Sequence, residues 1–599
     1  MLCRSHGLPS EIGRPPSTLR ASGSRRRVRA RGTGLACGLA CGLALLGVTD
    51  EAHAAPGVAN RLAGPNAQGP ATASVTGIYH NPAMLGQLPG LSFETTLRAG
   101  VDHLSVRRFG IATNGQPIDA LGGPVNLVNP AADYFIGASF LLDPIAIGVA
   151  VHTLGSRFRI NSDPSLDYHL VSETDIGCAL DGSRICPQLR KGGMLEMRTD
   201  FDIALAWNAL DFMSIGATVH LPRQRTYFAR DVDSVLTGAN ADTGCDPQSA
   251  SVENAACAER LSFRGSSRLR WFGLNQLPST RLDLAVTFGV AFDIRDRVVL
   301  GLRYRTQPLL GGGSITLNGS SAVCLPTGSN ADSGLPACEG ATSIDATLSE
   351  QIPQELAVGA AGEIGNWALD ANLYWIDRCP GGTPKGCDNR DSRSLELVGL
   401  DQDASTLPET TIYRGFKDLF GAELWARYRL DDLIGANLPY YKVLCSGSEG
   451  IDPATGKRLR CVPRADLLLG VGFNSPGVRP GALTVTNSDG WTLLATIGTS
   501  FNLPGRNGTW SLVPGYGVDF LVPTRVGPGG HDPAFTPAAA IEFEASGADL
   551  NSPAANSVLA GRGLPTNAGV YTGAVHTVML GVRWSERGFG ARELPKNRK

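Results

Sequence analysis

The chain contains long segments in which apolar residues alternate strictly with polar or small ones. In the clearest segment, residues 281–294, every even position from Leu282 to Ile294 is apolar, whereas the odd positions include Asp283 and Gly289. This period of two predicts a β-strand with one apolar face. The strand exceeds the ~5–6 residues usual in globular proteins and suits the roughly 9–11 residues of a membrane-crossing strand. The pattern therefore indicates a strand that faces lipid.

The same pattern recurs along most of the chain. Fourteen segments show it, at about 91–108, 132–142, 145–160, 194–207, 212–230, 281–294, 297–308, 351–364, 367–378, 411–430, 464–474, 490–503, 509–523 and 573–586. Bacterial outer-membrane barrels have an even number of antiparallel strands. We therefore predict an all-β fold, a transmembrane antiparallel β-barrel of about fourteen strands over residues 91–586.

The connections between these segments are alternately short and long. The short ones contain Asp143-Pro144, Asn208–Asp211, Arg295-Asp296, Gly365-Asn366 and Pro504–Gly508, and the long ones include 161–193, 231–280, 309–350, 379–410 and 524–572. Short periplasmic turns and long outer loops are typical of outer-membrane barrels. The connection 431–463 is much longer than the other predicted periplasmic turns. Either it is a periplasmic insertion or the predicted number of strands is wrong at this point.

Ten of the thirteen cysteines form five close pairs in polar stretches between the predicted strands. The pairs are Cys178 with Cys186, Cys245 with Cys257, Cys324 with Cys338, Cys379 with Cys387, and Cys445 with Cys461. Paired cysteines outside the core predict disulfides that staple loops, which requires an oxidising compartment. Zinc is the alternative, but the spacing does not match zinc ligands and the histidines do not cluster near the pairs. We predict no metal and no cofactor.

The N-terminus agrees with export. An arginine-rich stretch at 25–31 precedes an apolar run from Gly34 to Val48 and the sequence Ala52-His53-Ala54, which together predict a cleaved signal peptide over residues 1–54. Its removal takes away eight arginines and three acidic residues, so the formal net charge changes from −2 to −7. That charge argues against a nucleic-acid partner. Export and a barrel together predict the outer membrane of a Gram-negative cell, with outer-membrane lipid around the protein.

Residues 55–90, between the signal peptide and the first strand, are rich in small residues and end with Asn81-Pro82-Ala83. Here the chain resembles the FadL-type outer-membrane transporters of long-chain fatty acids, in which an N-terminal hatch ends in an Asn-Pro-Ala motif before the first of fourteen strands. The segments 301–305 and 469–476 also resemble that family. The resemblance implies a hatch at 55–90 that plugs the lumen. The remaining residues, 587–599, form a C-terminal tail that lacks the terminal aromatic residue of such barrels.

The resemblance also implies passive uptake of long-chain fatty acids or other hydrophobic molecules, which bind in the lumen and leave sideways beside the hatch. In the family a kink in the third strand forms the lateral opening. Here the apolar face changes parity near Gly155-Ser156, as one extra residue would cause. Alternatively the strand ends near Thr153 and a loop follows. We expect Asn81-Pro82-Ala83 to lie beside Gly155-Ser156 and to block the opening.

Charged residues on the inward faces suggest a ligand site. An amphipathic acid needs a cation for its carboxylate, and arginine can bind it with two hydrogen bonds. The candidates are Arg157, Arg159, Arg303 and Arg305. Most such charges are expected to form ion pairs across a polar lumen. The sequence contains no recognisable catalytic motif, so we predict a monomeric transporter and no enzyme. The alternative is a structural or adhesive barrel whose stapled surface loops are the functional part.

Overall fold

The structure, a computed structural model, places Asp50–Lys599 in one compact unit. It describes residues 62–88, 90–108, 110–111, 117–118, 125–153, 157–160, 193–233, 258–267, 284–294, 298–309, 313–324, 343–378, 395–399, 410–412, 416–430, 465–478, 483, 489–504, 508–526 and 569–586. None of the helices in these ranges is long and apolar enough to cross a membrane.

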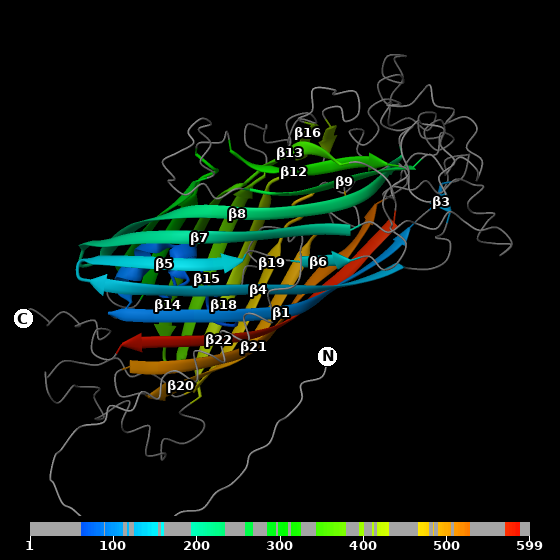
Figure 1. The fold of residues 1–599 in the computed structure, drawn as a ribbon. Coiled ribbons are helices and arrows are strands. Elements are labelled where there is room, and N and C mark those ends of the chain that lie inside the picture. Colours follow the sequence, from blue (N-terminus) through cyan, green and yellow to red (C-terminus); the bar gives the residue numbers. More distant parts are fainter. Residues whose placement is uncertain are drawn as a thin grey trace, which may run out of the picture. The chain divides into compact units, whose positions relative to one another are not determined.

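Fourteen strands form a closed antiparallel β-barrel (Figure 1). In order around the wall they are β1 (Leu91–Arg108), β4 (Val125–Leu142), β5 (Ile145–Thr153), β7 (Gly193–Leu210), β8 (Met213–Asp233), β10 (Ala285–Ile294), β11 (Val298–Arg305), β14 (Gln354–Ile364), β15 (Trp367–Asp377), β18 (Leu419–Arg429), β19 (Ala465–Asn474), β20 (Thr492–Pro504), β21 (Gly508–Val526) and β22 (Gly569–Glu586). The ring closes where β1 pairs with β22, from Ser92 opposite Ser585 to Arg108 opposite Gly569. Closure leaves the barrel without a free edge, as a lipid environment requires.

The predicted barrel is confirmed, and each predicted segment corresponds to one strand of the wall. Among the starting boundaries, the second and the tenth differ most. The second strand begins at Val125 rather than near 132, because Asn129-Pro130 interrupts the recognisable pattern. The tenth begins at Leu419 rather than near 411, where Thr410–Ile412 instead form a separate short strand, β17.

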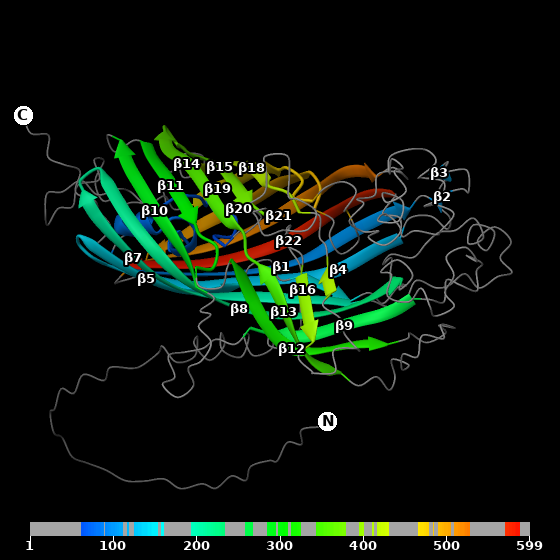
Figure 2. The same cartoon turned by 90° about the horizontal axis from the view of Figure 1, so that it is seen from above.

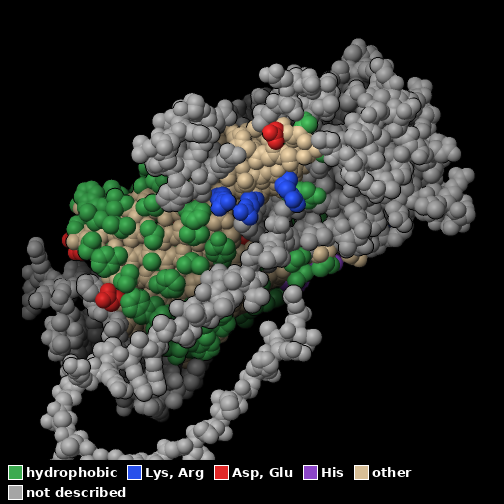
Figure 3. Space-filling view, viewed as in Figure 1, with side chains coloured by type: hydrophobic (Ala, Val, Ile, Leu, Met, Phe, Trp, Pro, Cys, Tyr) green, Lys and Arg blue, Asp and Glu red, His purple; other side chains and the backbone are tan. Residues whose placement is uncertain are grey.

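The two faces of the wall follow the predicted alternation. On β10, Phe288 is 52% exposed, whereas the neighbouring Thr287 is fully buried. On β11, Leu302 is 42% exposed and Arg303 is 6% exposed. Figure 3 shows the outward hydrophobic side chains gathered in a broad band over the barrel wall. Such a band matches the hydrocarbon layer of a membrane.

A second group of strands extends the sheet beyond the barrel, where the sequence predicted only loops. The inner part of β8 pairs with β10, and its outer part, from Arg225 to Asp233, pairs with β9. The extension continues from β9 through β12, β13 and β16 to β17 (Figure 2). These strands are β9 (Ala258–Ser266), β12 (Ser314–Cys324), β13 (Ile344–Gln351) and β16 (Leu395–Gly399). Apolar residues alternate with polar ones over only a few positions in these strands, and Ile315, Leu317 and Leu348 are buried, so the long lipid-facing pattern is absent. A separate pair joins β2 (Gly110–Ile111) to β3 (Pro117–Ile118).

The third strand of the wall is interrupted between β5 and β6 (Arg157–Ile160). Thr153 lies opposite Thr199 of β7, and Arg157 lies opposite Glu196, so the third strand has one residue more than β7 over this interval. This agrees with the parity change in the sequence. On the other side, the backbone N–H of Tyr134 on β4 donates to the Thr153 hydroxyl, at 2.9 Å, in place of a carbonyl of the ladder.

Some predictions concern residues that the structure does not describe. The signal peptide at 1–54, the tail at 587–599 and the lateral-gate residues Gly155 and Ser156 lie outside the described ranges. These three therefore stay predictions.

The five predicted disulfides also lie outside the part of the chain that the structure describes. Cys324 ends β12, but its side chain is not described, and the other nine cysteines fall between the described ranges. The described residues therefore show no disulfide, and the loop staples are not confirmed. The pairings that stay predictions are Cys178 with Cys186, Cys245 with Cys257, Cys324 with Cys338, Cys379 with Cys387, and Cys445 with Cys461.

Candidate functional site

Residues 62–88 of the predicted hatch lie inside the barrel and pack against its wall. They contain the helix α2 (Gly77–His80) and the 3-10 helix η1 (Pro82–Gln87), which contact strands from β4 to β10. Ile78, Ala83 and Leu85 are fully buried. The segment therefore occupies the lumen as a plug does.

Inward-facing glycines of the wall receive the hatch backbone. Gly148 of β5 lies against Ile78 and Leu85, and Gly301 of β11 lies against the backbone of Pro70. A Cβ at Gly216 of β8 would lie 2.7 Å from the Ala83 nitrogen. Glycine in a strand interior often marks such a close approach of another backbone. The wall is therefore shaped to hold this segment closely.

Replacing Gly216 with valine should displace the hatch, because the side chain would overlap the backbone of Pro82 and Ala83. We expect hydrogen exchange in hatch amides to become much faster while the barrel stays folded. The matched control is Ala371→Val, at an exposed position on the outer face of β15. Equal hatch protection in both variants would contradict the close fit.

Asn81 fixes the bend between the two hatch helices. Its Oδ1 accepts a hydrogen bond from the Ala83 backbone at 3.1 Å and caps η1. Its Nδ2 donates to the Pro70 carbonyl at 2.6 Å and to the Val290 carbonyl on β10 at 3.1 Å. Pro82 is the first residue of η1. At that position a backbone N–H has no partner within the helix, so proline fits without the loss of a hydrogen bond. One side chain thus joins two parts of the hatch to the wall.

The position of Asn81-Pro82-Ala83 relative to Gly155-Ser156 stays a prediction, because Gly155 and Ser156 lie outside the described residues. The motif contacts Gly216 on β8 and Gly289 on β10, and Gly216 lies in register with Ala206 and, through it, with Ala146 on β5. Sequence order alone did not indicate which strands of the wall the motif would contact.

Leu62 is a described hatch residue that lies beside Thr153, at the point where the third strand is interrupted. It lines a cavity of about 10 Å³ together with Thr96, Arg98, Asp133, Tyr134, Phe135 and Thr153. A cavity of that size holds at most about one water molecule. Leu62 of the hatch therefore lies on the inner side of the point where the pairing of β4 passes from β5 to β6.

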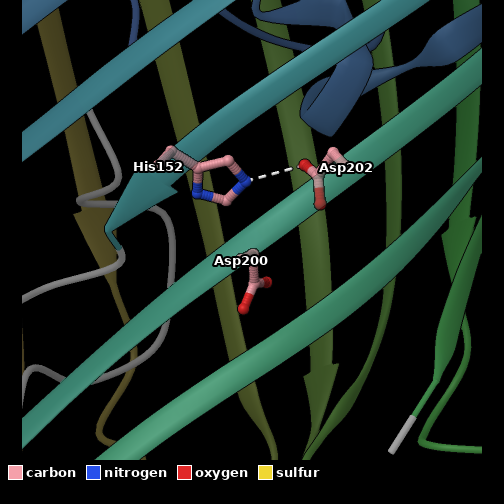
Figure 4. A group of neighbouring side chains, drawn as sticks. All are labelled: His152, Asp200 and Asp202. Atoms are coloured by element: carbon pink, nitrogen blue, oxygen red, sulfur yellow. Dashed lines mark hydrogen bonds and ion pairs between the residues drawn. The ribbon is translucent and has the colours of Figure 1, made fainter. Parts of the chain in front are cut away.

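A buried polar network lies between the hatch and the wall. Asp202 of β7 joins two histidines, since its oxygens lie 2.8 Å from His152 Nε2 and 2.7 Å from His220 Nδ1. His220 Nε2 lies 2.7 Å from the Thr287 hydroxyl, so the chain of contacts spans β5, β7, β8 and β10. Figure 4 shows His152 and Asp202 pointing toward each other, with Asp200 beside them. All three side chains are buried.

Asp200 holds two arginines. It lies 2.8 Å from Arg198 Nε and 2.8 Å from a terminal nitrogen of Arg305. Arg303 pairs with Glu355 of β14 in the same region. Buried charges require such partners, because unpaired ions in a low-dielectric interior are costly.

Tyr79 of the hatch inserts into the centre of this network. Its ring centroid lies 5.3 Å from the guanidinium carbon of Arg303 and 5.1 Å from that of Arg305. It also meets the rings of His152 and His220 edge-on, at 5.2 and 6.2 Å between centroids. Cation–π contacts that are shielded from water are worth about 2 kcal/mol or more. The network therefore helps to hold the hatch.

The predicted ligand arginines have these partners already. Arg303 and Arg305 face inward as predicted, but a ligand carboxylate would have to displace Glu355 or Asp200. Their role in ligand binding stays a prediction. Arg157 and Arg159 lie on β6, and the structure does not describe their side chains.

Sequence reasoning missed Tyr79, His152, His220 and Glu355. The inward parity of His152, His220 and Glu355 was available as a signal, but the strand register that brings them together and the path of the hatch that carries Tyr79 were not. His152, Asp200 and Asp202 offer ligand atoms within 4.8 Å of one another, as a metal site would. Both carboxylates already have partners, since Asp200 pairs with Arg198 and Arg305, and Asp202 pairs with His220. The donor set therefore fits an ion-pair network better than a metal site.

His80 makes hatch docking sensitive to pH. Burial, with added repulsion from Arg303 and His152, holds the pKa of His80 well below its ordinary value. Below about pH 6.5 the undocked hatch binds a proton at His80 that the docked hatch does not bind, so docking weakens as the pH falls. We expect faster hydrogen exchange of hatch amides at low pH, after correction for intrinsic rates, and a smaller pH effect in His80→Gln. An unchanged pH effect in that variant would rule out His80 as its source.

An apolar cluster, called the cap, lies at the end of the barrel opposite the tight turns. Val478 and Leu483 lie in the connection between β19 and β20. They pack against Leu104 and Val106 of β1 and against Tyr571 of β22. The Tyr571 hydroxyl donates to the Leu483 carbonyl at 3.3 Å. Asp489 in the same connection pairs with Arg378 at 2.5 Å. The described residues therefore place the hatch inside the barrel and the cap near its other end.

The fold is similar to that of a FadL homologue of known structure. A Pseudomonas aeruginosa FadL homologue superimposes with a TM-score of 0.52 at 12% identity, over 90% of this chain and 99% of that one. A deltaS2 mutant of the monoaromatic hydrocarbon channel TodX has a TM-score of 0.49 at 12% identity, over 87% of this chain and 96% of that one. The Ralstonia pickettii toluene transporter TbuX has a TM-score of 0.45 at 11% identity, over 88% of this chain and 100% of that one. At these identities the likeness shows the fold alone.

Comparisons of the sequence itself identified no similar protein. No model of a known protein family matches the chain, and no characterised protein sequence matches it.

Proposed function

We propose that this protein is an outer-membrane channel for the passive uptake of long-chain fatty acids or other hydrophobic molecules. The observation that carries the proposal is a closed barrel whose lumen holds both a hatch and an apolar cap. A water-filled porin has no use for either barrier. A channel for hydrophobic molecules needs an apolar entrance and a route that stays closed to water and ions.

The route we propose enters at the cap and leaves through the wall. The apolar residues of the cap offer a first binding surface. The exit lies at the break between β4 and the third strand, where the Thr153 hydroxyl replaces a ladder partner of Tyr134. Lateral exit would release the molecule into the membrane without exposure to water. Leu62, on the inner side of this break, would be the residue that moves.

A cross-link between hatch and wall tests the exit. In Leu62→Cys/Thr153→Cys a disulfide should reduce uptake of a fluorescent fatty acid and of a neutral hydrocarbon dye into proteoliposomes, and reduction should restore it. The two single variants and the wild type, treated with the same reductant, control for the native cysteines. Normal uptake by the locked protein would refute lateral exit, and absent uptake by the wild type would refute transport itself.

A structural or adhesive role is the second candidate. The observation in its favour is the sheet from β9 to β17, which extends the surface beyond the barrel. Under this alternative, removal of residues 258–266 and 314–351 would abolish surface binding and leave uptake of hydrophobic tracers unaffected.

A further inference from the structure

Three arginines face outward where the wall rises above its apolar band. Arg223 and Arg225 lie on β8 and Arg264 lies on β9, and all three are exposed. Arg225 pairs with Ser266 and Arg264 pairs with Tyr227, so the two arginines are diagonal neighbours, about 7–8 Å apart. The Arg264 guanidinium lies over the Tyr227 ring, 5.4 Å from its centroid. We call these three residues the arginine patch.

The arginine patch lies at the height of lipid headgroups. Below it, the outward residues of β8 include Ile215, Val219 and Leu221. Arg223 follows Met213, at the inner end of β8, by ten residues. With a rise of about 3.4 Å and a strand tilt of about 40°, this spans about 25 Å across the membrane, which is the height of the apolar band of such barrels. Figure 3 shows Lys and Arg side chains gathered at the border of the hydrophobic band.

The described residues leave the arginine patch with a positive charge. In the part of the chain that the structure describes, no carboxylate forms an ion pair with Arg223 or Arg225. On the same face, Asp345 lies two strands away from Arg264, beyond Ser320. A cluster of exposed arginines at this height attracts anionic headgroups, and each guanidinium can bind a phosphate through two hydrogen bonds.

We propose that the arginine patch binds the phosphate groups of an anionic glycolipid of the lipopolysaccharide type in the outer leaflet. The patch lies at the end of the barrel opposite the tight turns, which is the outer end if the long connections face outward. Tyr227 would lie beside the headgroup, where aromatic residues collect in barrels. Such a lipid would hold β8 and β9 where the sheet leaves the barrel.

Lipid binding by the purified full-length protein tests the proposal. Diphosphoryl lipid A, dephosphorylated lipid A and phosphatidylglycerol, each in detergent micelles, would be titrated against the wild type and against Arg223→Gln/Arg225→Gln. The matched control is Arg427→Gln/Arg429→Gln, which removes two partly exposed arginines paired with Glu363. Heat-modifiable gel mobility would show that each variant is folded.

We expect the wild type to prefer diphosphoryl lipid A over both other lipids. The patch variant should bind it about thirtyfold more weakly, as two interfacial cations predict, and the control variant should bind like the wild type. Arg223→Lys/Arg225→Lys should recover most of the affinity. Equal binding of the dephosphorylated lipid, a preference for phosphatidylglycerol, or equal losses in patch and control variants would each overturn the proposal.

Discussion

Deleting residues 55–85 should convert the closed channel into an open, water-filled pore that remains a folded barrel. The hatch fills the lumen through contacts with wall strands from β4 to β22. The hydrogen bonds that close the ring, between β1 and β22, do not involve it. A barrel needs no plug to satisfy its backbone. Fourteen strands enclose more space than the eight that side chains alone can fill.

Planar-bilayer recordings would measure this effect. The wild type should show almost no steady conductance, and the deletion variant should show stable pores. Heat-modifiable mobility on gels should be retained in both. A folded deletion variant that remains closed would show that the outer cap of Val478 and Leu483 seals the lumen alone, contrary to the prediction.

Replacing Asp200 with leucine should cost about 3–5 kcal/mol of barrel stability, because it leaves the buried Arg305 without its carboxylate. Both side chains are almost fully buried, with 0% of the Asp200 side chain and 1% of the Arg305 side chain exposed. The double variant Asp200→Leu/Arg305→Leu should recover a large part of the loss, since replacing both members of a buried pair by apolar residues is often nearly neutral.

Urea unfolding in lipid vesicles, followed by tryptophan fluorescence, would measure these free energies. Glu363→Gln is the control, because its pairs with Arg427 and Arg429 are partly exposed and should contribute about 1 kcal/mol or less. Similar losses in Asp200→Leu and Glu363→Gln would contradict the role assigned to the buried network.

The limits of prediction from sequence are clearest in the extension and in the hatch. The strands β12 and β13 alternate over only a few residues, and their apolar residues Ile315, Leu317 and Leu348 are buried rather than exposed to lipid. The Asn81-Pro82-Ala83 motif indicated a hatch, but it did not indicate that these residues would lie against Gly216 of β8 and Gly289 of β10. A plug of small residues can follow many paths through a lumen, and sequence spacing does not select one.

Alternation along the chain was enough to predict the strands of the barrel and the face that each residue of a strand presents. It is a local property, and one apolar residue at every second position places Phe288 in lipid and Arg305 in the lumen. Which inward residues meet one another became clear only in the folded barrel. His152, Asp202 and His220 come together through the register of three strands, and Tyr79 joins them through the path of the hatch. Register and path depend on closure of the whole ring, and no local pattern encodes that closure.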